Sequence, residues 1–300
     1  MQKTLSFLLI ATGSFLPAAA QNHYTGTIGK YPIELQAETS DGEHRTGIYM
    51  YKSNNIPIEL DCNLKDSTWT LFEKDSTGKP AASLTFRSFY ENSPAISGIW
   101  KDLRNGKEYP ISLQKDYDLH GSKNGSWEGR DMLQAASLKN SYFKVVLSRS
   151  KEDFYPRVIG VKIIDRKTDH LIQQLDMDCQ HIGFHDITTG DFNFDGYEDF
   201  SVFSESYAGA NSSSLYFLYD PATKRFGESK IGGISLFFDP ETKTITETNQ
   251  CCGGTAYTIT TYKVVKNEMV KLSENSYEWN NKKQDFIEQK PVPAKKKKKP

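Results

Sequence analysis

The chain has 300 residues, of which 25% are charged and 12% aromatic, and its formal net charge is −1. Without Lys3 and the five lysines at 295–299 the formal net charge falls from −1 to −7, so the body between them is acidic, which argues against a nucleic-acid-binding protein. No stretch beyond residue 20 approaches the roughly 18 consecutive apolar residues of a membrane-spanning helix.

Residues 1–20 have the layout of an export signal. A short basic start precedes an apolar run at 5–16, and small residues at 17–20 provide the Ala-x-Ala spacing that signal peptidase cleaves. An uncleaved membrane anchor is the alternative, but no stop-transfer run follows. We therefore expect a mature protein that begins near Gln21 and is periplasmic or secreted.

Residues 21–116 are expected to form an N-terminal β domain, either an antiparallel meander or a small barrel. Eight short β-rich segments are separated by turn signals rich in Gly, Asn, Asp and Ser. The sequences of 29–36 and 106–114 resemble each other, which suggests that the first and last strands are neighbours in a closed barrel. The expected strands are 24–28, 32–36, 46–51, 56–60, 69–72, 82–87, 96–100 and 109–113.

Residues 117–128 resemble a linker, and residues 129–288 are expected to form a C-terminal β-rich domain of hairpins with a short helix at 131–137. Asp-Pro-x-Thr-Lys occurs twice and predicts two hairpin turns, because proline presets φ and the aspartate accepts hydrogen bonds from turn amides. The proline-broken, lysine-rich tail at 289–300 is expected to be disordered. The expected strands are 142–148, 158–164, 171–175, 200–203, 215–219, 234–238, 257–265 and 269–272.

The sequence GDFNFDGYEDFSVF at 190–203 combines a polar loop with a strand pattern. Counted from Asp191, oxygen-bearing side chains stand at positions 1, 3, 5 and 9, and a glycine at position 6 permits a sharp turn. Hard oxygen ligands at this spacing suit Ca²⁺. The predicted ligands are Asp191, Asn193, Asp195, Tyr197 through its backbone carbonyl, and Asp199.

This loop differs from an EF-hand and from other metal sites. An EF-hand requires a bidentate glutamate at position 12, where this chain has Val202 inside a segment with strand alternation. Zinc fits less well because the loop has no histidine or cysteine, and magnesium usually keeps several waters. A plain polar turn is the remaining alternative. A calcium ion held entirely by protein oxygens has no open position for catalysis, so its expected role is structural.

The four cysteines are Cys62, Cys179, Cys251 and Cys252. Export permits disulfides, and three complete pairings are possible. One of them closes a strained ring between the adjacent cysteines. We favour a bridge from Cys179 to one of the adjacent pair. No Cys-x-x-Cys is present, so a thioredoxin-like or zinc-ribbon interpretation has no support.

The segment 191–199 and the apolar strand after it resemble the calcium loop of FG-GAP and VCBS repeats, which build integrin-type propellers from many copies. This chain has one copy. Together with the segment 207–214, the run 215–226 and Thr261-Tyr-Lys263, the loop resembles a family of bacterial envelope proteins with a single such loop. The N-terminal meander resembles the β domain often found ahead of it. Some members of that family inhibit glycoside hydrolase lysozymes, so the resemblance implies a periplasmic, lysozyme-inhibitor-like protein.

We expect a binding protein and not an enzyme, because the sequence contains no Gly-x-Ser-x-Gly, His-Glu-x-x-His or phosphate-binding loop. An inhibitor needs a preorganised loop that fills a cleft. The segment 204–214 follows the calcium loop, and its Glu205, Tyr207 and Asn211 are the expected contacts to a protein partner such as a cell-wall hydrolase. A carbohydrate-binding or adhesive envelope module is the alternative, and a glycoside hydrolase with paired carboxylates is a weaker one.

Overall fold

The computed structural model describes residues 21–38, 42–119 and 125–289. In these ranges the regular structure is β-strand apart from one 3₁₀ turn, η1 (Cys252–Gly254). The expected export signal at 1–20 and the lysines at 295–299 lie outside the described residues. Among those described, no helix has the length and apolar character needed to cross a membrane.

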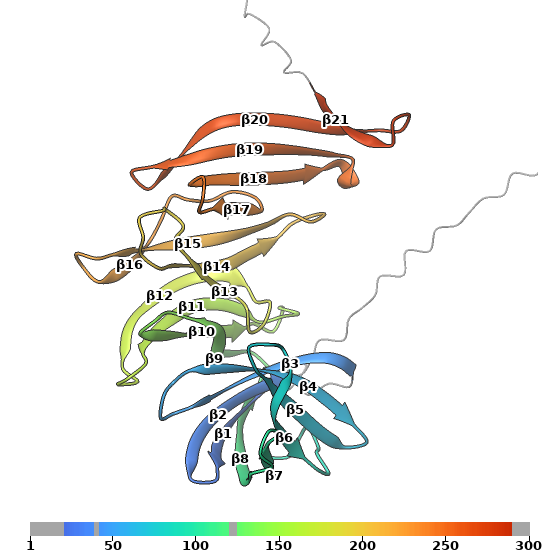
Figure 1. Ribbon diagram of the computed structural model, residues 1–300, viewed down its shortest axis with the longest axis vertical. Coiled ribbons are helices and arrows are strands. Elements are labelled where there is room, and N and C mark those ends of the chain that lie inside the picture. Colours follow the sequence, from blue (N-terminus) through green and yellow to red (C-terminus); the bar gives the residue numbers. More distant parts are fainter. Residues whose placement is uncertain (1–20, 39–41, 120–124, 290–300) are drawn as a thin grey trace, which may run out of the picture.

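The first eight strands form a closed antiparallel barrel, which lies at the foot of Figure 1. Each strand pairs with the next, and β1 pairs with β8 from Asn22↔Asp118 to Ile28↔Ile111, so the predicted closure is confirmed. All eight predicted strands are also confirmed. They are β1 (Gln21–Ile28), β2 (Tyr31–Glu38), β3 (Gly42–Tyr51), β4 (Pro57–Lys65), β5 (Thr68–Lys74), β6 (Pro80–Phe86), β7 (Ala95–Asp102) and β8 (Glu108–Asp118).

A glycine permits the close approach of β1 and β8. A Cβ atom built on Gly26 would lie 2.0 Å from the carbonyl oxygen of Ser112, so any larger residue would push the two strands apart. The interior that this closure seals is aromatic, and Tyr24, Tyr49 and Trp69 have no exposed surface. Alternation along the strands delivers these side chains to one face, as the sequence pattern predicts.

Three antiparallel sheets follow and are stacked upward from the barrel in Figure 1. In each sheet, strands that are consecutive in sequence are neighbours. The first sheet contains β9 (Trp127–Ser137), β10 (Ser141–Arg149), β11 (Arg157–Asp165) and β12 (Leu171–Gln180). The second contains β13 (Ile187–Gly190), β14 (Asp199–Ser206), β15 (Ser212–Asp220) and β16 (Arg225–Glu228). The third contains β17 (Leu236–Asp239), β18 (Thr244–Cys251), β19 (Ala256–Val265), β20 (Glu268–Asn280) and β21 (Asp285–Gln289).

Both Asp-Pro turns are confirmed as hairpin turns. One joins β15 to β16, where Asp220 accepts a hydrogen bond from the backbone amide of Ala222. The other joins β17 to β18, where Asp239 accepts one from the amide of Glu241. The predicted mechanism of these turns, a carboxylate that satisfies turn amides, is therefore present at both.

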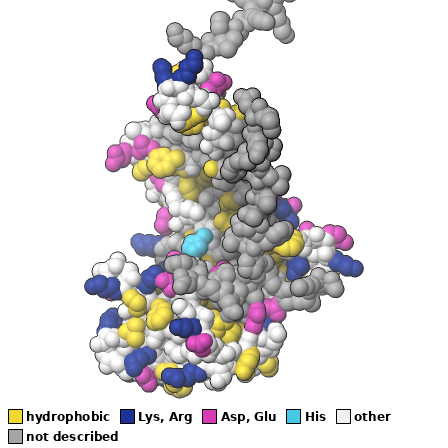
Figure 2. Space-filling view, turned by 90° about the vertical axis from the view of Figure 1, so that its right-hand side faces the viewer, with side chains coloured by type: hydrophobic (Ala, Val, Ile, Leu, Met, Phe, Trp, Pro, Cys, Tyr) yellow, Lys and Arg dark blue, Asp and Glu magenta, His cyan; other side chains and the backbone are white. Residues whose placement is uncertain are grey.

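Three hydrophobic clusters hold the layers together. One fills the barrel. A second extends from Ile48 and Met50 on the barrel through the first sheet to Phe200 and Phe217 of the second. A third joins the second sheet to the third and contains Ile245. The space-filling view shows hydrophobic, basic and acidic side chains interspersed over the barrel face turned toward the viewer (Figure 2).

The short helix expected at 131–137 is wrong, because these residues belong to β9. Short apolar runs do not distinguish helix from strand by periodicity alone. Here strand pairing decides, because β9 pairs antiparallel with β10. The Gln36 side chain of the barrel also accepts a hydrogen bond from the amide of Leu133 and donates one to the carbonyl of Asp131. β8 continues through Asp118 and β9 starts at Trp127, so strand occupies both ends of the expected linker at 117–128, and β21 includes residue 289.

Candidate calcium loop and the adjoining pockets

The predicted calcium loop is the turn of a hairpin between β13 and β14. The last residue of β13, Gly190, pairs with the first residue of β14, Asp199. The structure therefore brings all five predicted ligands into one turn and its closing residue. Gly196 has a φ of +92°, the left-handed conformation for which a glycine at position 6 was expected.

The side chains at positions 1, 3 and 5 point at amides of the loop itself. Asp191 accepts hydrogen bonds from the amides of Asp195 at 2.9 Å and Gly196 at 2.8 Å. Asn193 accepts from the amide of Asp195 at 3.2 Å, and Asp195 accepts from that of Tyr197 at 2.9 Å. These bonds fold the backbone around its polar side chains.

Asp199 is buried and ties the loop to the neighbouring strand. One carboxylate oxygen accepts from the amide of Phe192 at 2.9 Å and the other from the amide of Tyr219 at 2.8 Å. Burial, with smaller contributions from the nearby charges of Asp195 and Asp191, raises the pKa of Asp199 to about 6 against the lowering effect of these two bonds. The loop thus concentrates negative charge in one turn.

The donor set has the chemistry that calcium requires, since every candidate ligand is a hard oxygen. An ionised carboxylate has about four acceptor sites, so one or two amide bonds leave oxygen lone pairs for a metal ion. Across the described residues, however, no three His, Cys, Asp or Glu side chains converge closely enough to hold a metal. Calcium binding would therefore require Asp191, Asn193 and Asp195 to draw together around the ion.

The opposite side of the loop is apolar, which the sequence analysis did not recognise. Phe192 and Phe194 alternate with the polar residues and belong to the cluster between the second and third sheets, where both rings lie near Phe238. Phe194 has a φ of +63°, an uncommon conformation for a bulky residue. Asn193 also donates a hydrogen bond to Asn267 of the β19–β20 turn at 3.1 Å. The loop therefore connects two sheets.

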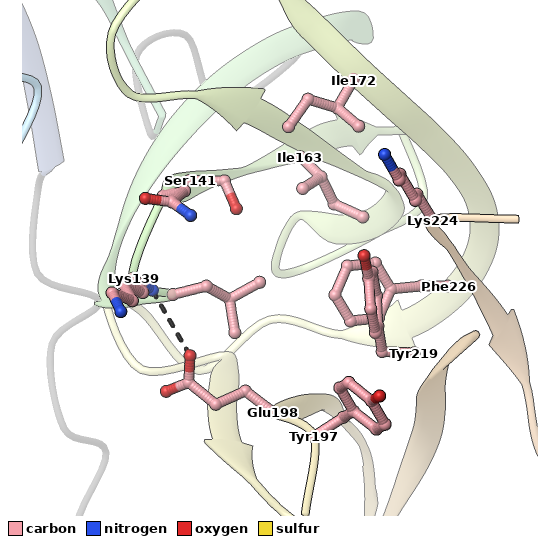
Figure 3. Close-up of a pocket in the computed structure, with 11 residues that line it drawn as sticks. Lys139, Ser141, Ile163, Ile172, Tyr197, Glu198, Tyr219, Lys224 and Phe226 are labelled. Carbon is pink, nitrogen blue, oxygen red and sulfur yellow. Dashed lines mark hydrogen bonds between the residues drawn. The ribbon is translucent and has the colours of Figure 1, made fainter. Parts of the chain in front are cut away.

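A pocket of about 420 Å³ lies beside the loop, between the first and second sheets (Figure 3). Tyr197 and Glu198 of the loop form one wall, and Glu198 accepts a hydrogen bond from the backbone amide of Lys139 at 3.4 Å. Ile163 and Phe226 contribute apolar surface. Any ordering of the loop would therefore also shape this pocket.

The three expected partner contacts do not form one group. β14 extends to Ser206 and β15 starts at Ser212, so the irregular loop is limited to 207–211. Glu205 lies in β14 and forms an ion pair with Arg157 at 3.1 Å. Tyr207 and Asn211 do lie together, on a second pocket of about 360 Å³.

Asn211 holds this second pocket in shape. Its side chain accepts a hydrogen bond from the amide of Gln250 at 2.9 Å and donates one to the carbonyl of the same residue at 2.7 Å. These two hydrogen bonds fix the β14–β15 loop against the end of β18. Tyr207, at 48% exposure, is the large side chain that this loop presents to solvent, and its hydroxyl lies 3.1 Å from that of Ser213.

The favoured bridge from Cys179 to the adjacent cysteines is wrong, since all four cysteines are free thiols. Cys179 lies buried in the core that the first and second sheets share, and burial raises its pKa to about 11. Cys62 is buried in the barrel, where burial raises its pKa as well. Cys251 and Cys252 are exposed, and their sulfur atoms lie 2.7 Å apart.

Comparison with known proteins adds little to this description. No protein-family model and no curated protein matches the chain. A solved structure of a Xanthomonas protein related to a type IV secretion system is 14% identical, with 89% of this chain and 99% of that chain covered and a TM-score of 0.29. A Lactobacillus plantarum protein is 9% identical, with coverages of 90% and 95% and a TM-score of 0.24. Such low scores carry no argument about fold or function.

Proposed function

We propose that this chain is an exported calcium-binding protein that acts by binding a partner and not by catalysis. The alternation within the 191–199 turn carries the proposal: polar oxygen ligands occupy one side, and the buried Phe192 and the partly buried Phe194 occupy the other. A turn alone would not need four such groups at this spacing, whereas a calcium loop does. Bound calcium would stiffen the connection between the second and third sheets.

The partner that we propose is a protein such as a cell-wall hydrolase. The 207–211 loop is short and held by Asn211, and it presents an exposed tyrosine. A loop with few accessible conformations loses little entropy on entering a cleft. The resemblance of the calcium loop and its following segments to envelope proteins that include lysozyme inhibitors points to the same class of partner.

A carbohydrate-binding or adhesive module is the second candidate. The exposed ring of Tyr207 beside a pocket is a surface on which a sugar ring can stack. Retention of the protein on insoluble glycan, without any effect on hydrolase activity, would favour this candidate. Suppression of lysozyme activity, without hydrolysis of peptidoglycan by the protein itself, would favour the inhibitor.

Titration calorimetry with calcium tests the metal site. We expect wild type to bind calcium and Asp195→Ala to lose most of the affinity. Asp239→Ala is the matched control, because Asp239 also accepts amide bonds in a turn but lies outside the loop. Equal calcium binding by wild type and Asp195→Ala would exclude the loop as the site.

A further inference from the structure

The adjacent thiols of Cys251 and Cys252 lie in an unusual backbone segment at the end of β18. Cys251 is extended, with φ −135° and ψ 179°, and Cys252 has a φ of +58°. Gly253 and Gly254 continue in the left-handed region at +67° and +83°. For a residue with a side chain, this conformation persists only where the surroundings impose it.

The surroundings do hold this turn. Cys251 pairs with Ala256 across the β18–β19 hairpin, and Gln250 just before it is fixed by the Asn211 side chain. The Thr255 hydroxyl donates to the Cys252 carbonyl at 2.8 Å, and the Thr255 carbonyl accepts from the amide of Trp279 at 2.8 Å. The two sulfurs are therefore kept together by backbone contacts on both sides.

We propose that Cys251 and Cys252 form a redox site that closes reversibly to a vicinal disulfide by exchange with a small-molecule or protein disulfide. Two separate observations carry this inference, namely the 2.7 Å contact between two exposed sulfurs and the fixed turn that maintains it. The exchange depends on neither the calcium loop nor the proposed partner.

The exchange is balanced in atoms and electrons. A thiolate of the pair attacks one sulfur of the incoming disulfide and expels the other as a thiolate, which leaves a mixed disulfide. The second cysteine then attacks its neighbour's sulfur and expels the remaining thiolate. The pair loses two protons and two electrons, and the incoming disulfide becomes two thiols. A dithiol reductant reverses the sequence.

The contact between the two sulfurs affects the ionisation of Cys251. The hydrogen bond with Cys252 raises the pKa of Cys251, with smaller contributions from burial and from the charges of Cys252 and Glu278. Cys62 and Cys179 do not compete, because both are buried and burial raises the pKa of each thiol.

Ring closure would change the second pocket, since both cysteines line it together with Tyr207 and Gln250. Two separate thiols would become one rigid disulfide. The pocket floor would then exist in two chemical states set by the redox poise of the surroundings.

The test is equilibration of the full-length protein in glutathione buffers of increasing oxidised fraction. Free thiols are then blocked in denaturant, and the digested protein is analysed by mass spectrometry. We expect the peptide with Cys251 and Cys252 to lose two hydrogens without gaining glutathione, and dithiothreitol to restore it. The peptides with Cys62 and Cys179 should be labelled as reduced thiols throughout.

Two controls make the outcome decisive. In Cys252→Ser, the remaining Cys251 has no partner and should carry at most one glutathione. In urea the turn is lost, so the equilibrium constant for ring closure should be at least about tenfold lower than in the folded chain. This difference corresponds to a shift of roughly 30 mV in the midpoint potential of the pair. Equal constants in both states, two glutathiones on the wild-type pair, or persistent thiols in the most oxidising buffer would each overturn the proposal.

Discussion

Glu34 of the barrel and Lys144 of the first sheet form a buried ion pair with a nitrogen–oxygen distance of 2.7 Å. Only 3% of the Glu34 side chain and 13% of the Lys144 side chain are exposed. Lys52 and His23 also contact Glu34, at 2.7 Å and 3.1 Å. This carboxylate therefore connects the barrel with the stacked sheets through a charge that water does not screen.

Substitution of Lys144 tests that connection. Removing one partner of a buried pair costs about 3–5 kcal/mol when the other charge is left uncompensated. Because Lys52 and His23 still face Glu34, we expect Lys144→Met to lower the free energy of unfolding by a smaller amount, about 1–3 kcal/mol. Urea unfolding measures it. Lys101→Met is the control, since its pair with Glu108 is exposed and should contribute about 0–1 kcal/mol. Equal losses in both variants would contradict the prediction.

The same carboxylate predicts a pH dependence. Burial alone would raise the pKa of Glu34, but the hydrogen bond with His23 and the charges of Lys144 and Lys52 outweigh it and hold the pKa well below the usual 4.5. The unfolded chain therefore takes up a proton at a higher pH than the folded chain does. The stabilisation of the folded chain by the ionised Glu34 is complete above pH 4.5 and is lost as the pH falls below that value. Urea midpoints between pH 6 and about 3 should fall more steeply for wild type than for Glu34→Gln.

Calcium should protect the third sheet as well as the loop. Phe192, Phe194 and Asn193 join the loop to that sheet, so an ion that rigidifies the turn reduces local opening of β17 and β18. At a free calcium concentration 100 times Kd we expect a gain of about 2.7 kcal/mol in stability. Hydrogen exchange with and without calcium measures the effect. Protection limited to the barrel, or the same protection in Asp195→Ala, would contradict it.

Partner binding can be assigned to one of the two pockets with a pair of tyrosine substitutions. Tyr207 and Tyr197 are similarly exposed, at 48% and 45%, and each lines a different pocket. We expect Tyr207→Ala to reduce capture of the envelope partner at least about tenfold, as loss of an aromatic anchor does, and Tyr197→Ala to leave it unchanged. The side-chain change at Tyr197 keeps the backbone carbonyl predicted to bind calcium. The reverse result would move the partner surface to the pocket beside the loop.

Closure of the barrel should be sensitive to a single methyl group. Gly26→Ala places a Cβ against the Ser112 carbonyl, so we expect a loss of about 1–3 kcal/mol or more in stability. Gly227→Ala, in another strand, meets no atom within 4 Å and should change stability by less than about 1 kcal/mol. Thermal unfolding of the two variants measures the difference. A stable Gly26→Ala variant would show that β1 and β8 can separate without cost.

The barrel could be predicted from the sequence because its strands alternate and its turns carry Gly, Asn and Asp at the positions that need them. The same holds for the Asp-Pro hairpins. β9 could not be predicted, since its short apolar run suits helix and strand alike, and its pairing with β10 and its bonds to Gln36 of the barrel are visible only in the structure. The candidate ligands were recognised from their oxygen atoms. Phe192 and Phe194 between them were not, because their role depends on a third sheet that begins at Leu236.

The pairing of β1 with β8 has a consequence for the order in which the molecule is made. Residue 22 is synthesised long before its partner at 118, so the first strand has one satisfied edge and one unsatisfied edge until the eighth strand has emerged. Contacts of such long sequence separation form slowly. Until β8 has emerged, the barrel is incomplete and has two open edges, each able to pair with another chain.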